Sequence, residues 1–171
     1  TVPIEINNGY GDMEINHISA PEFLLNNDAG YVSFTNIEAD TLQVSSTSGD
    51  ITINSSFIPD ISITSSSGYI NLKQTEYVDC SLTAKSGEIN IANAVSHGNL
   101  SLQTGSGDIS ISYQDKPDSL TFDVASGSED LSVNFTSADY QIETSARKQG
   151  IIGKGEYQLT LNSDHGTIVI K

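Results

Sequence analysis

The stretch Thr47–Ile53 reads TSGDITI, and three later stretches repeat its form. They are SSGYINL at Ser66–Leu72, KSGEINI at Lys85–Ile91 and GSGDISI at Gly105–Ile111. Each contains serine and glycine, then one variable residue, then two aliphatic residues separated by a polar one. A motif repeated in this way marks either one site made several times or one structural unit built several times.

The glycine of this motif recurs along the chain at a nearly constant spacing. Successive intervals are 19, 19, 19, 19, 20, 20 and 39 residues, the last close to two periods. A fixed period of this length is typical of solenoid proteins, in which each repeat buries its apolar stripe only by stacking on its neighbours. The glycines are Gly11, Gly30, Gly49, Gly68, Gly87, Gly107, Gly127 and Gly166.

Two short apolar arms flank each glycine. Around Gly49 they are Leu42 and Val44 before it, and Ile51 and Ile53 after it. Alternation of apolar and polar residues is typical of strands with one buried face, and no stretch shows the spacing of a crossover helix. The pattern therefore predicts an all-β fold, a single-stranded parallel β-solenoid with a period of 19–20 residues.

The count of first arms predicts nine rungs, each pairing with the next in sequence order, within a single domain spanning residues 1–171. At a strand spacing of about 4.8 Å, this corresponds to a rod on the order of 40 Å long. The bias of parallel crossovers favours right-handed coiling. The expected rungs begin at Ile4, Phe23, Leu42, Ile61, Cys80, Leu100, Leu120, Tyr140 and Leu159. Cys80 shares its column with aliphatic residues and is interpreted as a small core residue.

The glycine between two inward-facing arms is expected to form a corner, because glycine adopts positive φ without a Cβ clash. A serine precedes it in five rungs, and its hydroxyl is expected to bond to nearby backbone in the corner and to the same hydroxyl one rung away. No His or Lys recurs beside these serines to activate a nucleophile, so we interpret them as structural. The residue after the glycine is expected to point outward, in a column of Asp12, Tyr31, Asp50, Tyr69, Glu88 and Asp108.

Two interpretations of this outward column stay open. It is either a solvated corner in which tyrosines separate like charges, or a surface that binds calcium or a glycan. The glycine- and aspartate-rich nonapeptide of calcium-binding β-rolls is absent from the sequence, and each rung offers one acid at this corner. The sequence therefore predicts no cofactor, with Ca²⁺ as the alternative.

The period breaks in the last third of the chain. After Gly127 the arm SEDLSV places Leu131 and Val133 two positions late, which predicts a bulged corner. The final strand, Thr167–Lys171, remains apolar. The C-terminal end is therefore expected to need a cap, a neighbour or more chain.

An irregular rung is expected near residues 143–158, where Arg147 takes the glycine position. Arg147, Lys148 and Lys154 gather there and are candidate ligand-binding residues, because specificity is often grafted where a repeat departs from its consensus. The alternative interpretation is a longer turn before the final rung.

The chain is strongly acidic, with 7 Lys and Arg against 22 Asp and Glu and a formal net charge of −15. Phosphate binding needs a basic footprint, so nucleic acid and anionic membrane surfaces are not expected as partners. No apolar run is long enough for membrane insertion, and one cysteine excludes an internal disulfide. The polar, Lys-poor and Cys-poor composition is compatible with a bacterial secreted or wall-exposed protein. Because the chain starts at Thr1 without Met or a signal peptide, it is interpreted as a mature or trimmed piece.

The SGDI-type repeat, its paired apolar arms and the closing GKGEYQLTLNSDHGTIVI resemble a bacterial adhesin family. Proteins of that kind include LiaG- and LiaX-type envelope-stress proteins of Gram-positive bacteria and the related head-domain adhesins. The resemblance covers almost the whole chain and implies a β-solenoid presented at the cell envelope, often behind a membrane anchor or a short helical domain. It implies an envelope component, glycan, peptide or protein as partner, and it transfers no catalytic residue.

Three functions compete at this stage. The first is a non-enzymatic, cell-surface binding or scaffold module. The second is a polysaccharide-active β-helix enzyme, which needs a cleft of paired carboxylates or a Ca²⁺ with a catalytic base. The third is a polymerising scaffold of the bactofilin kind that stacks end to end. The sequence favours the first, because one arginine and no long loops offer little to wall a cleft.

Overall fold

The computed structural model describes residues 2–171, which form two β-sheets of ten and eight strands around one apolar core. The larger sheet contains β1 (Ile4–Tyr10), β3 (Ser19–Ala29), β5 (Glu38–Ser46), β7 (Asp60–Ser67), β9 (Asp79–Ser86), β11 (Asn99–Ser106), β13 (Leu120–Ser126), β15 (Ala138–Glu143), β16 (Arg147–Ile152) and β17 (Tyr157–His165). The smaller contains β2 (Met13–Asn16), β4 (Val32–Thr35), β6 (Ile51–Asn54), β8 (Ile70–Lys73), β10 (Ile89–Ala94), β12 (Ile109–Tyr113), β14 (Leu131–Val133) and β18 (Ile168–Ile170). None of the described residues belongs to a helix that could cross a membrane.

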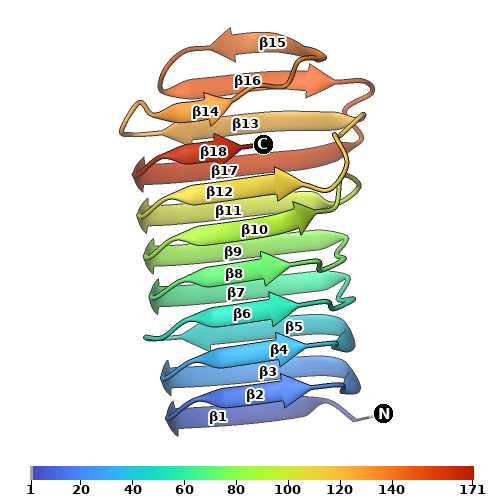
Figure 1. The fold of residues 1–171 in the computed structure, drawn as a ribbon, viewed down its shortest axis with the longest axis vertical. Coiled ribbons are helices and arrows are strands. Elements are labelled where there is room, and N and C mark those ends of the chain that lie inside the picture. Colours follow the sequence, from blue (N-terminus) through green and yellow to red (C-terminus); the bar gives the residue numbers. More distant parts are fainter. Residues whose placement is uncertain (1) are drawn as a thin grey trace.

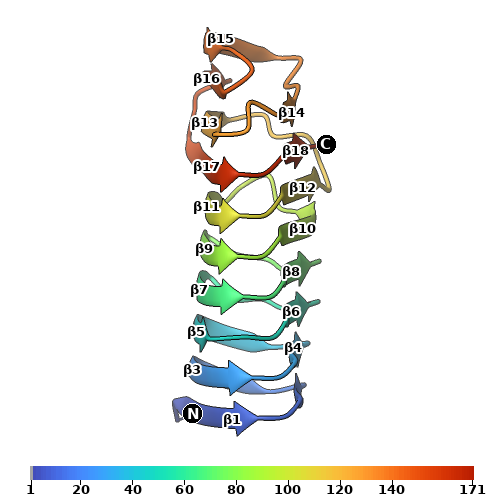
Figure 2. The ribbon, with the colours of Figure 1, turned by 90° about the vertical axis from the view of Figure 1, so that its left-hand side faces the viewer.

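The first six rungs confirm the predicted parallel β-solenoid and its period. Each first arm joins the larger sheet and each second arm the smaller one, so that Leu42 pairs with Phe23 on one side and with Ile61 on the other. In Figure 1 the chain runs right to left in the rear sheet and left to right in the front sheet while it rises. Figure 2 shows the same two sheets edge on. The coil is therefore right-handed, as predicted.

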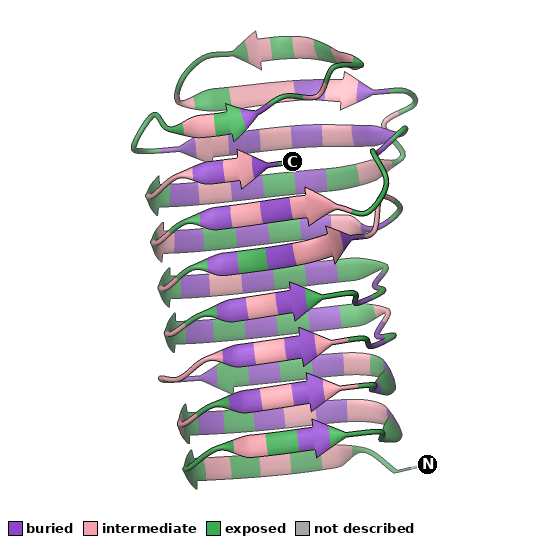
Figure 3. Cartoon of the chain, in the orientation of Figure 1, coloured by how far each residue is buried: buried purple, intermediate pink, exposed green. Residues whose placement is uncertain are grey.

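The core consists of the side chains that the alternation points inward. Figure 3 shows buried residues alternating with exposed or intermediate ones along the strands of both sheets. Cys80 is 3% exposed within its aliphatic column, and burial raises the pKa of its thiol, so the sulfur stays protonated. The interpretation of Cys80 as a core residue is confirmed.

The predicted succession of nine rungs is wrong after β12. Strand β17 lies between β11 and β13, and β18 lies between β12 and β14. The last rung in sequence is therefore inserted between the sixth and the seventh (Figure 1). The C-terminal strand was expected to need a cap, a neighbour or more chain, and the same insertion supplies a neighbour, because β18 has a paired strand on both sides.

A shift of register explains why the period misleads at this point. Leu159 pairs with Leu100 as the period requires, but its partner in β13 is Phe122 instead of Leu120. The seventh rung thus already runs two residues late in its first arm, and β14 continues the shift against β18. The bulged corner expected after Gly127 is therefore misplaced, since the shift arises before β13.

The residues expected to form an eighth rung make an antiparallel hairpin instead. Strand β16 pairs antiparallel with both β13 and β15, so the segment expected to be irregular contains a paired strand at Arg147–Ile152. Gly150 lets β16 approach Phe122, because a Cβ there would lie 2.7 Å from the ring. Phe135 and Tyr140 pack on Phe122 with ring centroids 5.0 and 5.4 Å away, and cover this end of the core.

The corner glycines stack directly on one another. A Cβ at Gly49 would lie 2.1 Å from the carbonyl oxygen of Gly30, and a Cβ at Gly68 would lie 2.3 Å from that of Gly49. Gly49 and Gly68 also have φ of 106° and 111°, a region that side chains rarely enter. Both constraints select glycine at this corner.

We expect Gly68→Ala to lower the free energy of unfolding by about 3 kcal/mol, because the methyl group adds a clash with backbone to an unfavourable φ. Gly9→Ala is the matched control, since a Cβ at exposed Gly9 meets nothing within 4 Å, and it should change stability by no more than about 0.5 kcal/mol. Urea denaturation measures both. Equal stability of the two variants would contradict the glycine stack.

Candidate functional site

The outward column predicted from the sequence runs along the edge of the rod that carries the glycine corners. Its aspartates accept hydrogen bonds from the backbone of the adjacent rung. Asp50 Oδ1 accepts from the N–H of Tyr69 at 2.9 Å, and Asp12 and Asp108 accept from Tyr31 and Thr167 at 2.9 and 2.7 Å. One oxygen of each of these carboxylates is therefore used to pair a backbone donor within the fold.

The tyrosines of this column alternate with the acids and remain partly open to solvent. Tyr31 and Tyr69 are 38% and 48% exposed. The backbone carbonyl of Glu88 accepts the N–H of Ile70, which continues the link between rungs. Across residues 2–171, no three His, Cys, Asp or Glu side chains are grouped so that they could hold a metal ion. The column thus offers Ca²⁺ single carboxylates, three of which are already bonded to backbone.

Two of the serines before the glycines bond to backbone of the neighbouring rung, not to the serine hydroxyl that was expected there. Ser48 Oγ donates to the carbonyl of Asp28 at 3.1 Å, and Ser67 Oγ donates to that of Thr47 at 3.3 Å. Ser126 differs, because the register shift places it in a buried column together with Ser163. The structural interpretation of Ser48 and Ser67 therefore agrees with their contacts.

A buried polar column at this corner was missed by sequence reasoning. Asn27 is its most connected member, since its Nδ2 donates to Gly30 O, Ser46 Oγ and Ser48 O at 3.1–3.2 Å. The available signal was a polar residue three positions before the glycine, on the inward side of the strand. The column contains Asn27, Ser46, Ser65, Thr104, Ser163 and Ser126.

A second corner, on the opposite edge, was also missed. Five non-glycine residues adopt positive φ there, between 49° and 56°. Each follows a motif glycine by six positions, a regularity that the sequence already contained. They are His17, Asn36, Ser55, Gln74 and Asn93.

Two of the three candidate cations connect the terminal hairpin of β15 and β16 to β13 and β14. Arg147 donates from Nε and Nη2 to Asp123 at 2.9 and 2.6 Å, and this hydrogen bonding raises the pKa of its guanidinium. Lys148 Nζ donates to the carbonyl of Val133 at 2.7 Å and lies 5.7 Å from the ring centroid of Tyr140. These contacts explain why charged residues interrupt the repeat here.

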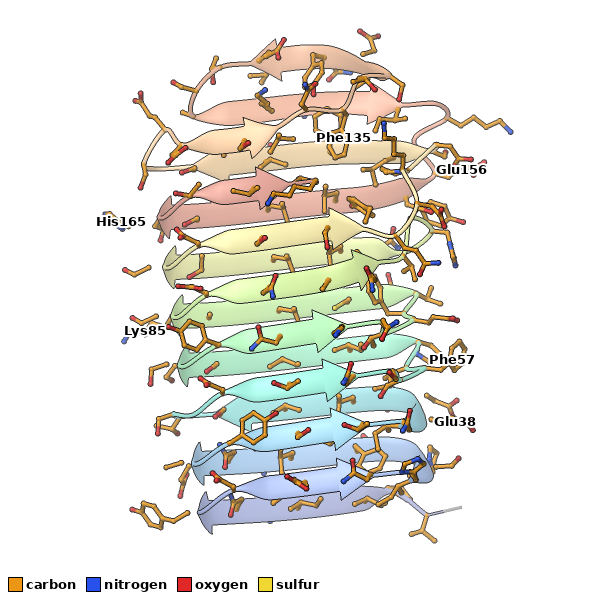
Figure 4. All side chains as sticks on the ribbon, viewed as in Figure 1. Glu38, Phe57, Lys85, Phe135, Glu156 and His165 are labelled. Carbon is orange, nitrogen blue, oxygen red and sulfur yellow. The ribbon has the colours of Figure 1, made fainter. Side chains whose placement is uncertain are left out.

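Lys154 lies apart from the acidic column. Its side chain is 85% exposed, and its Nζ is 3.9 Å from Glu156, which Figure 4 places on the edge opposite Lys85 and His165. The structure therefore does not bring the candidate cations and the Asp/Tyr column into one site.

The larger sheet presents an uncharged polar surface that was not predicted. Two adjacent rows of five outward side chains cross β5, β7, β9, β11 and β17 in register, all of them exposed or half-buried. We call these ten residues the polar face; they are Gln43, Ser45, Ser62, Thr64, Ser81, Thr83, Ser101, Gln103, Thr160 and Asn162. None is charged, although the chain carries a net charge of −15.

A shallow groove of about 280 Å³ lies along one margin of the polar face. It is lined by Ser62, Ser81 and Ser101 of that face and by a row of Asp60, Asp79 and Asn99 beside it. Asn99 Nδ2 donates to Asp79 at 2.8 Å, which fixes the two side chains. The groove offers hydroxyl and carboxylate groups to a polar ligand.

The chain belongs to the Toastrack DUF4097 family, whose family model matches residues 3–171. No curated protein and no solved structure matches it significantly. The resemblance to adhesins and LiaG-type proteins is narrower than this family and stays a prediction.

We expect Asp50→Ala to lower the free energy of unfolding by about 1–2 kcal/mol, because it leaves the N–H of Tyr69 without its acceptor. Asp50→Asn should cost less than half of that, since an amide oxygen can still accept. Asp40→Ala, at an exposed acid outside the column, is the control. Calcium binding at the outward column would be indicated instead if millimolar Ca²⁺ raised the Tm of the unmodified chain but did not raise the Tm of the Asp50→Ala variant.

Proposed function

We propose that this Toastrack-family chain is a non-enzymatic binding and scaffold module at the cell envelope, with an adhesin-like role. The observation that carries the proposal is that two sets of polar groups differ in their contacts. Those at the glycine corner bond from rung to rung, whereas the ten side chains of the polar face project from a rigid sheet. A surface of this kind binds by contact over several rungs.

The titratable groups give little support to an enzymatic role. The groups with raised pKa besides exposed Arg147 are Tyr77, Cys80 and Tyr113, and burial is the main cause in each. Raised pKa values keep these groups protonated, so they do not supply a base near neutral pH. This favours the binding module over the polysaccharide-active alternative.

A neutral glycan of the envelope is the partner that best fits the polar face. Hydroxyl and amide side chains can donate to and accept from sugar hydroxyls. Anionic polymers would meet repulsion from Asp60 and Asp79 beside this face and from the net charge of −15. A polymer lying across several rungs would add many weak contacts, which gives avidity without a deep pocket.

End-to-end polymerisation is less well supported. At the end opposite the N-terminus, β15 and β16 extend the larger sheet alone, since the smaller sheet ends at β14 (Figure 2). A second copy could not continue both sheets there.

We expect the chain to bind at least one neutral envelope polysaccharide and to leave its glycosidic bonds intact. Ser81→Arg with Ser101→Arg should weaken binding about tenfold, because two bulky charges would enter the polar face. The matched control, Thr52→Arg with Ser110→Arg, changes the outward row of the smaller sheet and should bind normally. Glycan arrays and biolayer interferometry give the affinities, and a reducing-end assay detects cleavage. Equal binding by both variants would refute the assigned face, and cleavage would refute the non-enzymatic role.

A further inference from the structure

An apolar cavity of about 230 Å³ opens beside the inserted last rung. Its walls come from the ends of β12 and β18, from β16 and from the segments 116–117 and 134–137. The apolar lining consists of Tyr113, Pro117, Phe135, Ile152 and Ile170. This cavity is separate from the polar face, and no step of the binding proposal uses it.

The cavity lies beside the inserted rung. The end of β18 borders it on one side, and the segments 116–117 and 134–137 border it on the others. The walls are fixed by hydrogen bonds. The N–H of Lys171 donates to Ile111 O at 2.9 Å, and the N–H of Tyr113 donates to Lys171 O at 3.1 Å.

Phe135 forms a rigid part of the wall. Its ring packs on Phe122 at a centroid distance of 5.0 Å, and its backbone N–H donates to the hydroxyl of Tyr140 at 2.9 Å. Figure 4 shows Phe135 in front of β13, toward the hairpin end of the molecule. The cavity is therefore preformed, which lowers the entropic cost of binding.

Two lysines place positive charge at the rim of this cavity, in a chain whose net charge is −15. Lys116 and Lys171 both line it and are both exposed. Within residues 2–171, neither ammonium lies within salt-bridge distance of a carboxylate, although Asp115 and Asp118 flank Lys116 in sequence. Two of the seven Lys and Arg residues thus meet at one apolar cavity.

We propose that this cavity binds a small amphipathic carboxylate, with its apolar part inside and its carboxylate beside Lys116 and Lys171. The size of the cavity limits the apolar part. An apolar cavity of about 150 Å³ holds a benzene ring, so the present one suits a single ring or short alkyl chain with a few further atoms. Among side chains at its rim, Asn134, Thr136 and Ser137 can hydrogen-bond to the same head group.

Phenylacetate is the probe for a two-dimensional NMR titration of the whole chain. Saturable shifts should concentrate on Phe135, Ile170 and Lys171, with millimolar affinity, as suits a ligand of about ten heavy atoms. The neutral isostere phenylacetamide should bind about threefold more weakly or worse, since it loses the attraction to exposed lysines. Acetate, which lacks the apolar part, should cause no saturable shifts.

Lys116→Gln with Lys171→Gln should reduce the affinity for phenylacetate to that for phenylacetamide. Lys73→Gln with Lys85→Gln removes the same charge from exposed positions elsewhere and should leave the affinity unchanged. The proposal would be overturned by absent or scattered shifts, by equal affinity for acid and amide, or by equal loss in both variants. None of these results bears on glycan binding, which occurs on the other surface.

Discussion

The close stacking of backbone at the glycine corner is the constraint on which the rest of the structure depends. The space between successive corners leaves no room for a Cβ, as the contact between Gly49 and the carbonyl of Gly30 shows. This approach brings the carboxylate of Asp50 to the N–H of Tyr69 and the hydroxyl of Ser48 to the carbonyl of Asp28. The corner thus sets the register of both sheets, and the register places like side chains in rows on the faces.

The inserted last rung sets the properties of the other end. It separates the sixth rung from the seventh, so β13 can take β17 on one side and the antiparallel β16 on the other. The hairpin then covers the core with Phe135 and Tyr140. The cavity beside Lys116 and Lys171 lies next to this rung, at the end of β18. One departure from sequence order therefore produces the cap and brings β18 to the wall of the cavity.

The sequence was sufficient to predict the local structure of the first six rungs, because alternation and a corner glycine act over a few residues. Leu42, Ile51 and Cys80 lie where the period placed them. It was insufficient for the order of the last rungs, because β13 and β17 carry similar apolar patterns and either could pair with β11. The two-residue delay of Leu131 and Val133 was the available sign, and it was interpreted as a bulged corner instead of a shift of the whole rung. Arg147 and Lys148 stood out for their chemistry, yet their partners Asp123 and Val133 depend on that unpredicted pairing.

The insertion of β17 is the central structural claim, and a disulfide test addresses it most directly. Ser101 and Thr160 face outward at paired positions of β11 and β17, so Ser101→Cys with Thr160→Cys should form a disulfide on mild oxidation. Stacking in sequence order would instead place Thr121 opposite Ser101, whereas in the structure these residues lie on strands separated by β17, about 10 Å apart. Mass spectrometry of oxidised Ser101→Cys/Thr160→Cys and Ser101→Cys/Thr121→Cys should find a crosslink in the first only. A crosslink in the second only would contradict the insertion.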